Sequence, residues 1–350
     1  GGEGPTTLLV FDFGGGTLDV TVMELRGEMS FRVRSTDGDL RLGGEDIDAA
    51  LVKYFLRDIK EKCGVDLEAM EEGRKKSKAF KQLSQACARL KVDLSRMQES
   101  DFCLDDFVED HTFEGRMDKE TFDRLVDPIV QRIRGPIDRA LQKVHGGMRA
   151  IDVDQVLLVG GSSRIPRVQE VLRDIFPGTE LCRRINPDEA IVIGAAIEAS
   201  RSVDLIDVVP RPLSIATANH SDRSRSFATQ IVAACTPIVD GGITFTECFA
   251  NSRDGQDCVT IRVCEGEAEF FDDNLRLGVF EITGIPPRPR GEVEIRVAMT
   301  VDADGILSVS AVVEGTGQTL DATVVTSKGR MSESQIEDKR RENREFASSG

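Results

Sequence analysis

LLVFDFGGGTLDV, residues 8–20, places three successive glycines directly behind a buried apolar run. Successive glycines cost backbone entropy on folding, so they need a compensating role. Such a turn lets backbone N–H groups approach an anion closely, and Asp12 just before it could hold a hydrated Mg²⁺. No Lys-Ser/Thr pair follows as in a P-loop, and the next residues alternate as a strand does, which excludes a dinucleotide-binding helix. The segment is either a strand–turn–strand phosphate loop or an ordinary tight hairpin.

A second glycine turn follows another buried run, VLLVGGSSRIP at residues 156–166. Pro166 suits the first turn of a helix, so Gly160 to Ser163 form a strand-to-helix turn, where ligands commonly bind in α/β domains. Arg164 could stack over a purine ring. A simple strand–helix loop is the alternative.

The periodicity of the chain changes near Pro210. Before it, strands alternate with helices expected at 47–63, 73–95, 119–144, 166–176 and 188–200, which is typical of an α/β domain. After it, short alternating runs at 259–263, 293–301, 306–313 and 322–325 predict an antiparallel all-β module. Asp302 to Gly305 resembles a calcium loop but fits a hairpin turn better. A charged helix is expected at 333–346.

Composition narrows the function classes. Across 350 residues the formal net charge is -16, which disfavours binding to nucleic acid or to an anionic membrane surface. No apolar run approaches the ~20 residues of a membrane span. The 8 cysteines include no C-x-x-C pair and indicate reduced thiols of an intracellular protein. The 3 histidines are far apart, which argues against a metal site.

Together these segments resemble the heat-shock protein 70 (DnaK-type) chaperone family, in family order along nearly the whole chain. The glycine turns at 11–20 and 159–166 are similar to the family's second phosphate loop and adenosine loop. Residues 42–48 and 185–190 are similar to the entry of its inserted subdomain and to the start of its last nucleotide-domain helix. Residues 280–287 and 302–311 are similar to its peptide-binding sandwich.

The resemblance implies an α/β actin-like ATPase lobe followed by an all-β peptide-binding sandwich and a short C-terminal helix. Residues 1–200 would form the second lobe of the nucleotide-binding domain, with the inserted subdomain at about 43–118. Residues 201–209 would be the linker, 210–327 the sandwich and 328–350 the start of a truncated helical lid.

The resemblance also implies the site residues, cofactors and partners. ATP or ADP with Mg²⁺ would bind, the metal through water on Asp12, and ATP binding and hydrolysis would control peptide release. Partners would be unfolded or nascent polypeptides, J-domain co-chaperones and nucleotide-exchange factors, with no nucleic acid and no membrane, in the cytoplasm. The expected peptide-binding residues are Phe249, Val259 and Ile261. The expected nucleotide-binding residues are Asp12, Gly14, Gly15, Gly16, Thr17, Lys91, Ser95, Gly160, Gly161, Ser162, Arg164 and Asp188.

Departures from the family pattern lead to further expectations. The family's first phosphate loop and catalytic lysine belong to a lobe that would precede Gly1, so this chain alone is expected to be catalytically incomplete. Ala88 stands where the family has a carboxylate, and Val92 where an arginine flanks the adenine, so nucleotide affinity is expected to be weak. The alternative is a non-enzymatic truncated paralogue that acts as a peptide holdase or co-chaperone-binding module. A third hypothesis, a relative of the sugar kinases that share the actin-like core, is disfavoured because those enzymes lack the all-β module predicted after Pro210.

Overall fold

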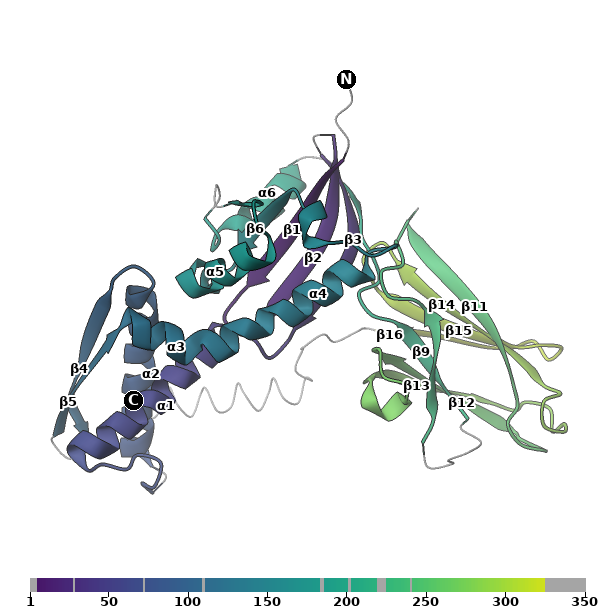
Figure 1. Ribbon diagram of the computed structural model, residues 1–350. Helices are drawn as coiled ribbons and strands as arrows, with labels where there is room; N and C mark the ends of the chain where they lie inside the picture. Colours follow the sequence, from purple (N-terminus) through teal and green to yellow (C-terminus); the bar gives the residue numbers. More distant parts are fainter. Residues whose placement is uncertain are drawn as a thin grey trace. The chain divides into compact units, whose positions relative to one another are not determined.

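The computed structural model describes residues 5–27, 29–71, 73–108, 111–182, 186–200, 203–218, 225–239 and 241–324. The chain divides into two compact units, Gly1–Val208 and Val209–Gly350. Within the described residues the first unit combines helices with sheets, and the second is built from strands and one short 3-10 turn (Figure 1). The expected lid, residues 328–350, lies outside the described residues, as does the helix expected at 333–346.

The main sheet of the first unit has the strand order β7-β6-β1-β2-β3-β8. Strand β1 pairs antiparallel with β2 and parallel with β6, with Asp12 opposite both Asp19 and Val159. Parallel pairing places the carboxyl ends of β1 and β6 at the same edge, where the two glycine turns begin. The strands are β1 (Thr6–Phe13), β2 (Leu18–Arg26), β3 (Ser30–Asp39), β6 (Gln155–Val159), β7 (Glu180–Cys182) and β8 (Asp204–Ile206).

Strand β8 lies inside the segment expected to be a linker. It pairs parallel with β3, and the Ser30 hydroxyl donates a 2.8 Å hydrogen bond to the Asp204 carboxylate. Only three residues form the strand, too few for alternation to reveal it in the sequence.

The helices of the first unit lie against the main sheet or beside a two-stranded hairpin. In Figure 1, α1 (Gly44–Cys63) and α2 (Arg74–Leu94) lie beside the hairpin of β4 (Glu99–Val108) and β5 (His111–Asp118). There the Phe55 ring packs edge-on against Phe102 at 4.9 Å. The remaining helices are α3 (Lys119–Val130), α4 (Arg134–Lys143), α5 (Pro166–Ile175) and α6 (Ala190–Ser200).

The helix expected over 119–144 is interrupted by a 3-10 turn at Gln131–Ile133. Pro136 lies in the first turn of α4 and has no backbone N–H to continue an unbroken helix. Proline is tolerated in a first turn, so the chain starts a new helix there.

Two four-stranded antiparallel sheets form the second unit, with strand orders β10-β9-β12-β13 and β11-β14-β15-β16. Buried residues of both sheets, among them Ile215, Ile261, Val297 and Val309, share one hydrophobic core. The first sheet comprises β9 (Leu213–Thr217), β10 (Phe227–Val232), β12 (Cys258–Glu265) and β13 (Leu275–Thr283). The second comprises β11 (Gly242–Ala250), β14 (Glu294–Asp302), β15 (Leu307–Val313) and β16 (Gln318–Val324).

The predicted turn at Asp302 to Gly305 is confirmed as the hairpin between β14 and β15. The Asp302 carboxylate accepts the backbone N–H groups of Asp304 and Ile306, and Gly305 has a φ of 76°. This carboxylate therefore stabilises its own turn.

Among the described helices, none is both long and apolar enough to traverse a lipid bilayer.

Candidate functional site

A cavity of about 360 Å³ opens at the sheet edge where β1 and β6 end. The two glycine turns, the end of α2 and the start of the segment leading into α6 all contribute to it. Its lining includes the predicted nucleotide-binding residues Gly15, Lys91, Ser95, Gly161, Ser162, Arg164 and Asp188. Val92, Arg96 and Ile165 complete the lining, and none of these three was predicted to bind a ligand. The other predicted residues, Asp12, Gly14, Gly16, Thr17 and Gly160, lie in the two strand ends and turns that frame it.

The first glycine turn is confirmed as a strand–turn–strand, since β1 and β2 pair on either side of it. The Gly14 N–H donates to the Thr17 carbonyl at 3.0 Å and closes the turn. The carbonyls of Gly14 and Gly15 accept the N–H groups of Gly44 and Glu45, at 3.0 and 2.7 Å, where α1 begins. In the described part of the chain, the N–H groups of Gly15 and Gly16 have no acceptor. Two free N–H donors in one turn suit an anionic oxygen.

Glycine is required where α1 meets this turn. A Cβ on Gly43 would lie 2.2 Å from the Gly15 carbonyl oxygen, and one on Gly44 would lie 2.4 Å from the Ser162 hydroxyl. Both contacts are far inside van der Waals distance, so the helix can approach the turn only with glycine at these positions. The sequence pattern of residues 42–48 predicts only the entry of a subdomain, and nothing in it indicates this close approach to the cavity edge.

The second glycine turn is fixed against the first. The Ser162 hydroxyl donates a 2.8 Å hydrogen bond to the Gly14 carbonyl. Gly160 has a φ of 78°, and a Cβ there would lie 2.4 Å from the Phe13 carbonyl oxygen and 2.8 Å from Asp12 Oδ1. Only glycine combines this left-handed conformation with so close an approach. The turns therefore form one continuous edge of the cavity.

The end of α2 supplies the facing part of the lining. Lys91 Nζ donates to Asp48 Oδ2 at 2.8 Å and to the Gly44 carbonyl at 3.1 Å. The Ser95 hydroxyl donates to the Lys91 carbonyl at 2.8 Å. Both hydrogen bonds of Lys91 thus go to the first turns of α1 within the same chain. Arg96 lies just beyond the helix and adds a second cation to the lining.

Arg164 and Asp188 form an ion pair at the opposite end. Arg164 Nη2 donates to Asp188 Oδ2 at 2.7 Å and also to the Asn186 side chain. Arg164 Nε is buried and has no hydrogen-bond partner in the described structure. A buried unsatisfied donor is costly, and functional sites are where such groups concentrate. A Cβ on Gly161 would lie 2.9 Å from Asp188 Oδ1, so glycine allows this carboxylate to lie over the turn.

Two carboxylates stand side by side at the base of the first turn. Asp12 is half-buried opposite Asp19, and both burial and the Asp19 charge raise the pKa of Asp12. A divalent cation would offset both effects. No group of three metal-ligating side chains occurs among the described residues. The half-buried carboxylate of Asp12 would suit a Mg²⁺ ion that keeps most of its water ligands, because such an ion needs few carboxylates from the protein.

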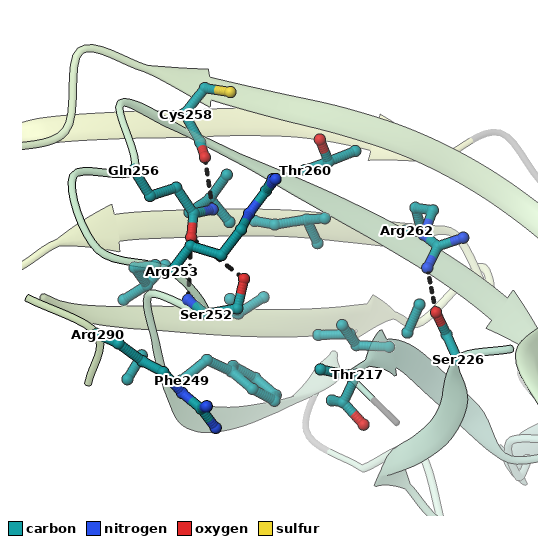
Figure 2. A pocket seen from close by; sticks show the side chains of 18 of the residues that line it. Thr217, Ser226, Phe249, Ser252, Arg253, Gln256, Cys258, Thr260, Arg262 and Arg290 are labelled. Carbon is teal, nitrogen blue, oxygen red and sulfur yellow. Dashed lines mark hydrogen bonds between the residues drawn. The ribbon is translucent and has the colours of Figure 1, made fainter. Parts of the chain in front are cut away.

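A larger cavity, of about 700 Å³, lies in the second unit between its two sheets and three loops (Figure 2). The predicted peptide-binding residues Phe249, Val259 and Ile261 all line it, together with Ile295 and Val297 of β14. Ile261 is buried, and Phe249 and Val259 are partly buried against the core. All three residues therefore belong to the lining of one cavity.

The chain is similar to known proteins along nearly its whole length. A family model described as Hsp70 protein matches residues 2–350. The chain is 38% identical to the heat shock 70 kDa protein of Neurospora crassa over 346 residues, covering 96% of this chain and 51% of that protein. It is 36% identical to the chaperone protein DnaK of Thermus thermophilus over 334 residues, covering 92% of this chain and 51% of that protein. The chain spans about half the length of the curated relatives it matches.

Proposed function

The chain belongs to the Hsp70 family, and from that premise we propose that it binds an adenine nucleotide in its first unit and an extended apolar polypeptide in its second. The family match implies an actin-like ATPase fold, with which the α/β first unit agrees. We propose that the second unit is the peptide-binding sandwich. The observation that carries the proposal is the convergence of both glycine turns on one cavity.

The residues around the first cavity have distinct roles in this proposal. The free N–H groups of Gly15 and Gly16 would bind phosphate oxygens. The guanidinium of Arg164, held by Asp188, would stack on the purine ring. Mg²⁺ would supply charge neutralisation for the phosphates, and Asp12 would orient its water ligands.

Two of the three described cations that line this cavity, Lys91 and Arg164, are already engaged by other groups of the protein. Lys91 is engaged with Asp48 and the Gly44 carbonyl, and Arg164 with Asp188, so neither is available to stabilise charge that develops on a transferred phosphoryl group. Helix α6 is strongly apolar, yet none of its residues is buried in the described structure. Ile191 and Val192 are each 65% exposed. We propose that a further protein surface covers α6 and completes the catalytic site.

The same proposal includes ATP control of peptide release. It also includes docking of J-domain co-chaperones and nucleotide-exchange factors. They rest on family membership, since the relatives are a chaperone and heat shock proteins about twice as long. The non-enzymatic holdase remains the second candidate, because the free surface of α6 and the engaged cations argue against independent turnover.

Two measurements on the purified chain test the proposal. Fluorescence anisotropy of a labelled ADP should report Mg²⁺-dependent binding that is weakened in Arg164→Gln and unchanged in Arg173→Gln, a distant control in the same unit. A single-turnover assay with radiolabelled ATP should show no hydrolysis above the Arg164→Gln background. Absence of nucleotide binding at millimolar concentration would refute the nucleotide role, and rapid hydrolysis would refute the incomplete catalytic site.

A further inference from the structure

We propose that the cavity of the second unit selects extended peptides in which aspartate or glutamate flanks an apolar residue. This inference rests on the proposed peptide-binding function and names the substrate class of that site. It is carried by the charges that surround the cavity and by the hydrogen bonds that hold two of the charged loops in place.

All charged side chains that line the cavity within the described structure are arginines: Arg225, Arg253, Arg262 and Arg290. No aspartate or glutamate belongs to this described lining, although the whole chain has a formal net charge of -16. The acidic character of the protein is therefore reversed at this cavity. An anionic ligand would be attracted here and repelled by most of the remaining surface.

The arginines stand at two ends of the cavity. At one end Arg225 pairs with Asp273 at 2.5 Å and stacks over the Phe270 ring at 3.8 Å. Arg262 on β12 donates to the Ser226 hydroxyl at 2.5 Å and lies 4.9 Å from the centroid of a second ring, that of Phe271. Both guanidinium groups are thereby held in place by neighbouring side chains of this unit. The carboxylate of Asp273 offsets the charge of Arg225.

At the other end, Arg253 and Arg290 come from two separate loops, which join β11 to β12 and β13 to β14 (Figure 2). Their loops are joined by Asn251, which is 2% exposed. Its Nδ2 donates to the carbonyls of Arg253 and Pro289, each at 2.9 Å, and its Oδ1 accepts the N–H groups of Gly291 and Val293, each at 3.0 Å.

Further bonds link the same loops. The Arg290 N–H donates to Asp254 Oδ1 at 2.7 Å, and the Gly255 N–H donates to the Arg288 carbonyl at 3.0 Å. The two arginines are thus presented by a fixed frame, so a ligand need not order the loops itself. Arg253 is exposed and makes no ion pair with any described residue. Its guanidinium is the group best placed to gain from an acidic ligand.

The lining between the two ends includes the apolar side chains of Phe249, Val259 and Ile261. An extended peptide projects successive side chains to opposite faces, so an apolar side chain can contact this part of the lining while its neighbours reach the edge. A carboxylate there would meet a guanidinium, which suits bidentate pairing. Lysine at the same place would meet like charge.

The test compares three peptides with the same fluorescein label and the same core: Asp-Asp-Leu-Leu-Leu-Asp-Asp, its Asn-flanked form and its Lys-flanked form. Anisotropy with the full chain should rank them Asp, then Asn, then Lys, with about three- to tenfold between neighbours, as expected for exposed charge-assisted pairs. Raising the salt concentration should reduce the preference. A peptide of aspartates alone, without the apolar core, should bind far more weakly.

Arg253→Gln should remove most of the preference for Asp over Asn, measured as the ratio of the affinities for the two peptides. Arg276→Gln is the matched control, since Arg276 lies in the same unit, pairs with Asp272 and is absent from the cavity lining. Equal affinity for all three flanks, or tighter binding of the Lys form, would overturn the inference and leave the proposed function standing. Tight binding of the aspartate-only peptide would also overturn it, because the cavity would then be a general anion site. If none of the peptides binds, the proposed peptide-binding function itself fails.

Discussion

The Ser162 hydroxyl donates a hydrogen bond of 2.8 Å to the Gly14 carbonyl, and this bond joins two glycine turns that lie 148 residues apart in the chain. Ser162 is nearly buried, so water does not readily replace the bond. The same carbonyl also accepts the Gly44 N–H at 3.0 Å. One oxygen thus connects the end of β1, the turn after β6 and the start of α1.

Ser162→Ala should lower the free energy of unfolding by about 1 kcal/mol, the usual net value of one hydrogen bond, and should weaken nucleotide binding as the turns separate. Ser163→Ala is the control, since Ser163 is buried and its hydroxyl bonds only within its own turn, to the Gly160 carbonyl at 2.7 Å. Ser163→Ala should lower the free energy of unfolding by a similar amount and leave the nucleotide affinity unchanged. Urea unfolding and labelled-ADP anisotropy check both. Equal nucleotide affinity in the two variants would contradict the role given to Ser162.

Gly43→Ala should disrupt the cavity, because its Cβ would lie 2.2 Å from a backbone oxygen that cannot move without shifting the turn. We expect a loss of about 1–3 kcal/mol of stability, typical of overpacking, together with loss of nucleotide binding. In Gly16→Ala the added Cβ meets nothing within 4 Å, so stability should change little. Thermal unfolding followed by circular dichroism distinguishes them. If Gly43→Ala has the same melting temperature as Gly16→Ala, the close approach of Gly43 to the Gly15 carbonyl is not important for stability.

Asp12→Asn should raise the melting temperature at pH 7 while abolishing Mg²⁺-dependent nucleotide binding. The folded protein holds the Asp12 proton more tightly than the unfolded chain, because burial and the charge of Asp19 raise the pKa of this carboxyl above its ordinary value. The ionised carboxylate therefore costs stability as the pH rises through that raised pKa. The gain in Asp12→Asn should be complete at neutral pH and vanish below the ordinary aspartate pKa. A melting temperature that falls at pH 7 would contradict this assignment.

Val92→Arg should strengthen nucleotide binding by about tenfold or more, equivalent to one charge-assisted contact of roughly 1.5–3 kcal/mol. Val92 is 48% exposed and lines the cavity, so a longer cationic side chain has room to lie over a bound ring. Arg89→Gln, on an exposed face of the same helix outside the lining, serves as a charge control. Titration calorimetry with Mg·ADP measures both. Unchanged affinity in Val92→Arg would mean that the ring does not bind beside α2.

Much of the site can be predicted from the sequence because its chemistry depends on local patterns. Buried runs followed by glycine turns predict both strand ends, and Pro166 predicts the helix after the second turn. The hydrogen-bond pairing of β1 with β6 then brings the turns together. The strand alternation at Val259 and Ile261 likewise predicts their common face.

The remaining features depend on contacts that no local pattern reveals. The need for Gly43 and Gly44 comes from residues far away along the chain, Gly15 and Ser162. Arg96 lines the cavity from a position two residues beyond the end of α2 at Leu94, where helical periodicity does not place a side chain. Asn251 holds two arginine loops through backbone carbonyls and N–H groups, which are the same for any sequence.

The most direct test of the central proposal is an NMR titration of the ¹⁵N-labelled chain with Mg·ADP, which detects even millimolar affinity. Our account predicts that the amide resonances of Gly15, Gly16 and Gly161 move together along one binding curve, with those of Ser95 and Arg96, while that of Arg276 stays fixed. Shifts confined to only one of the two glycine turns, or none at saturating nucleotide, would contradict it.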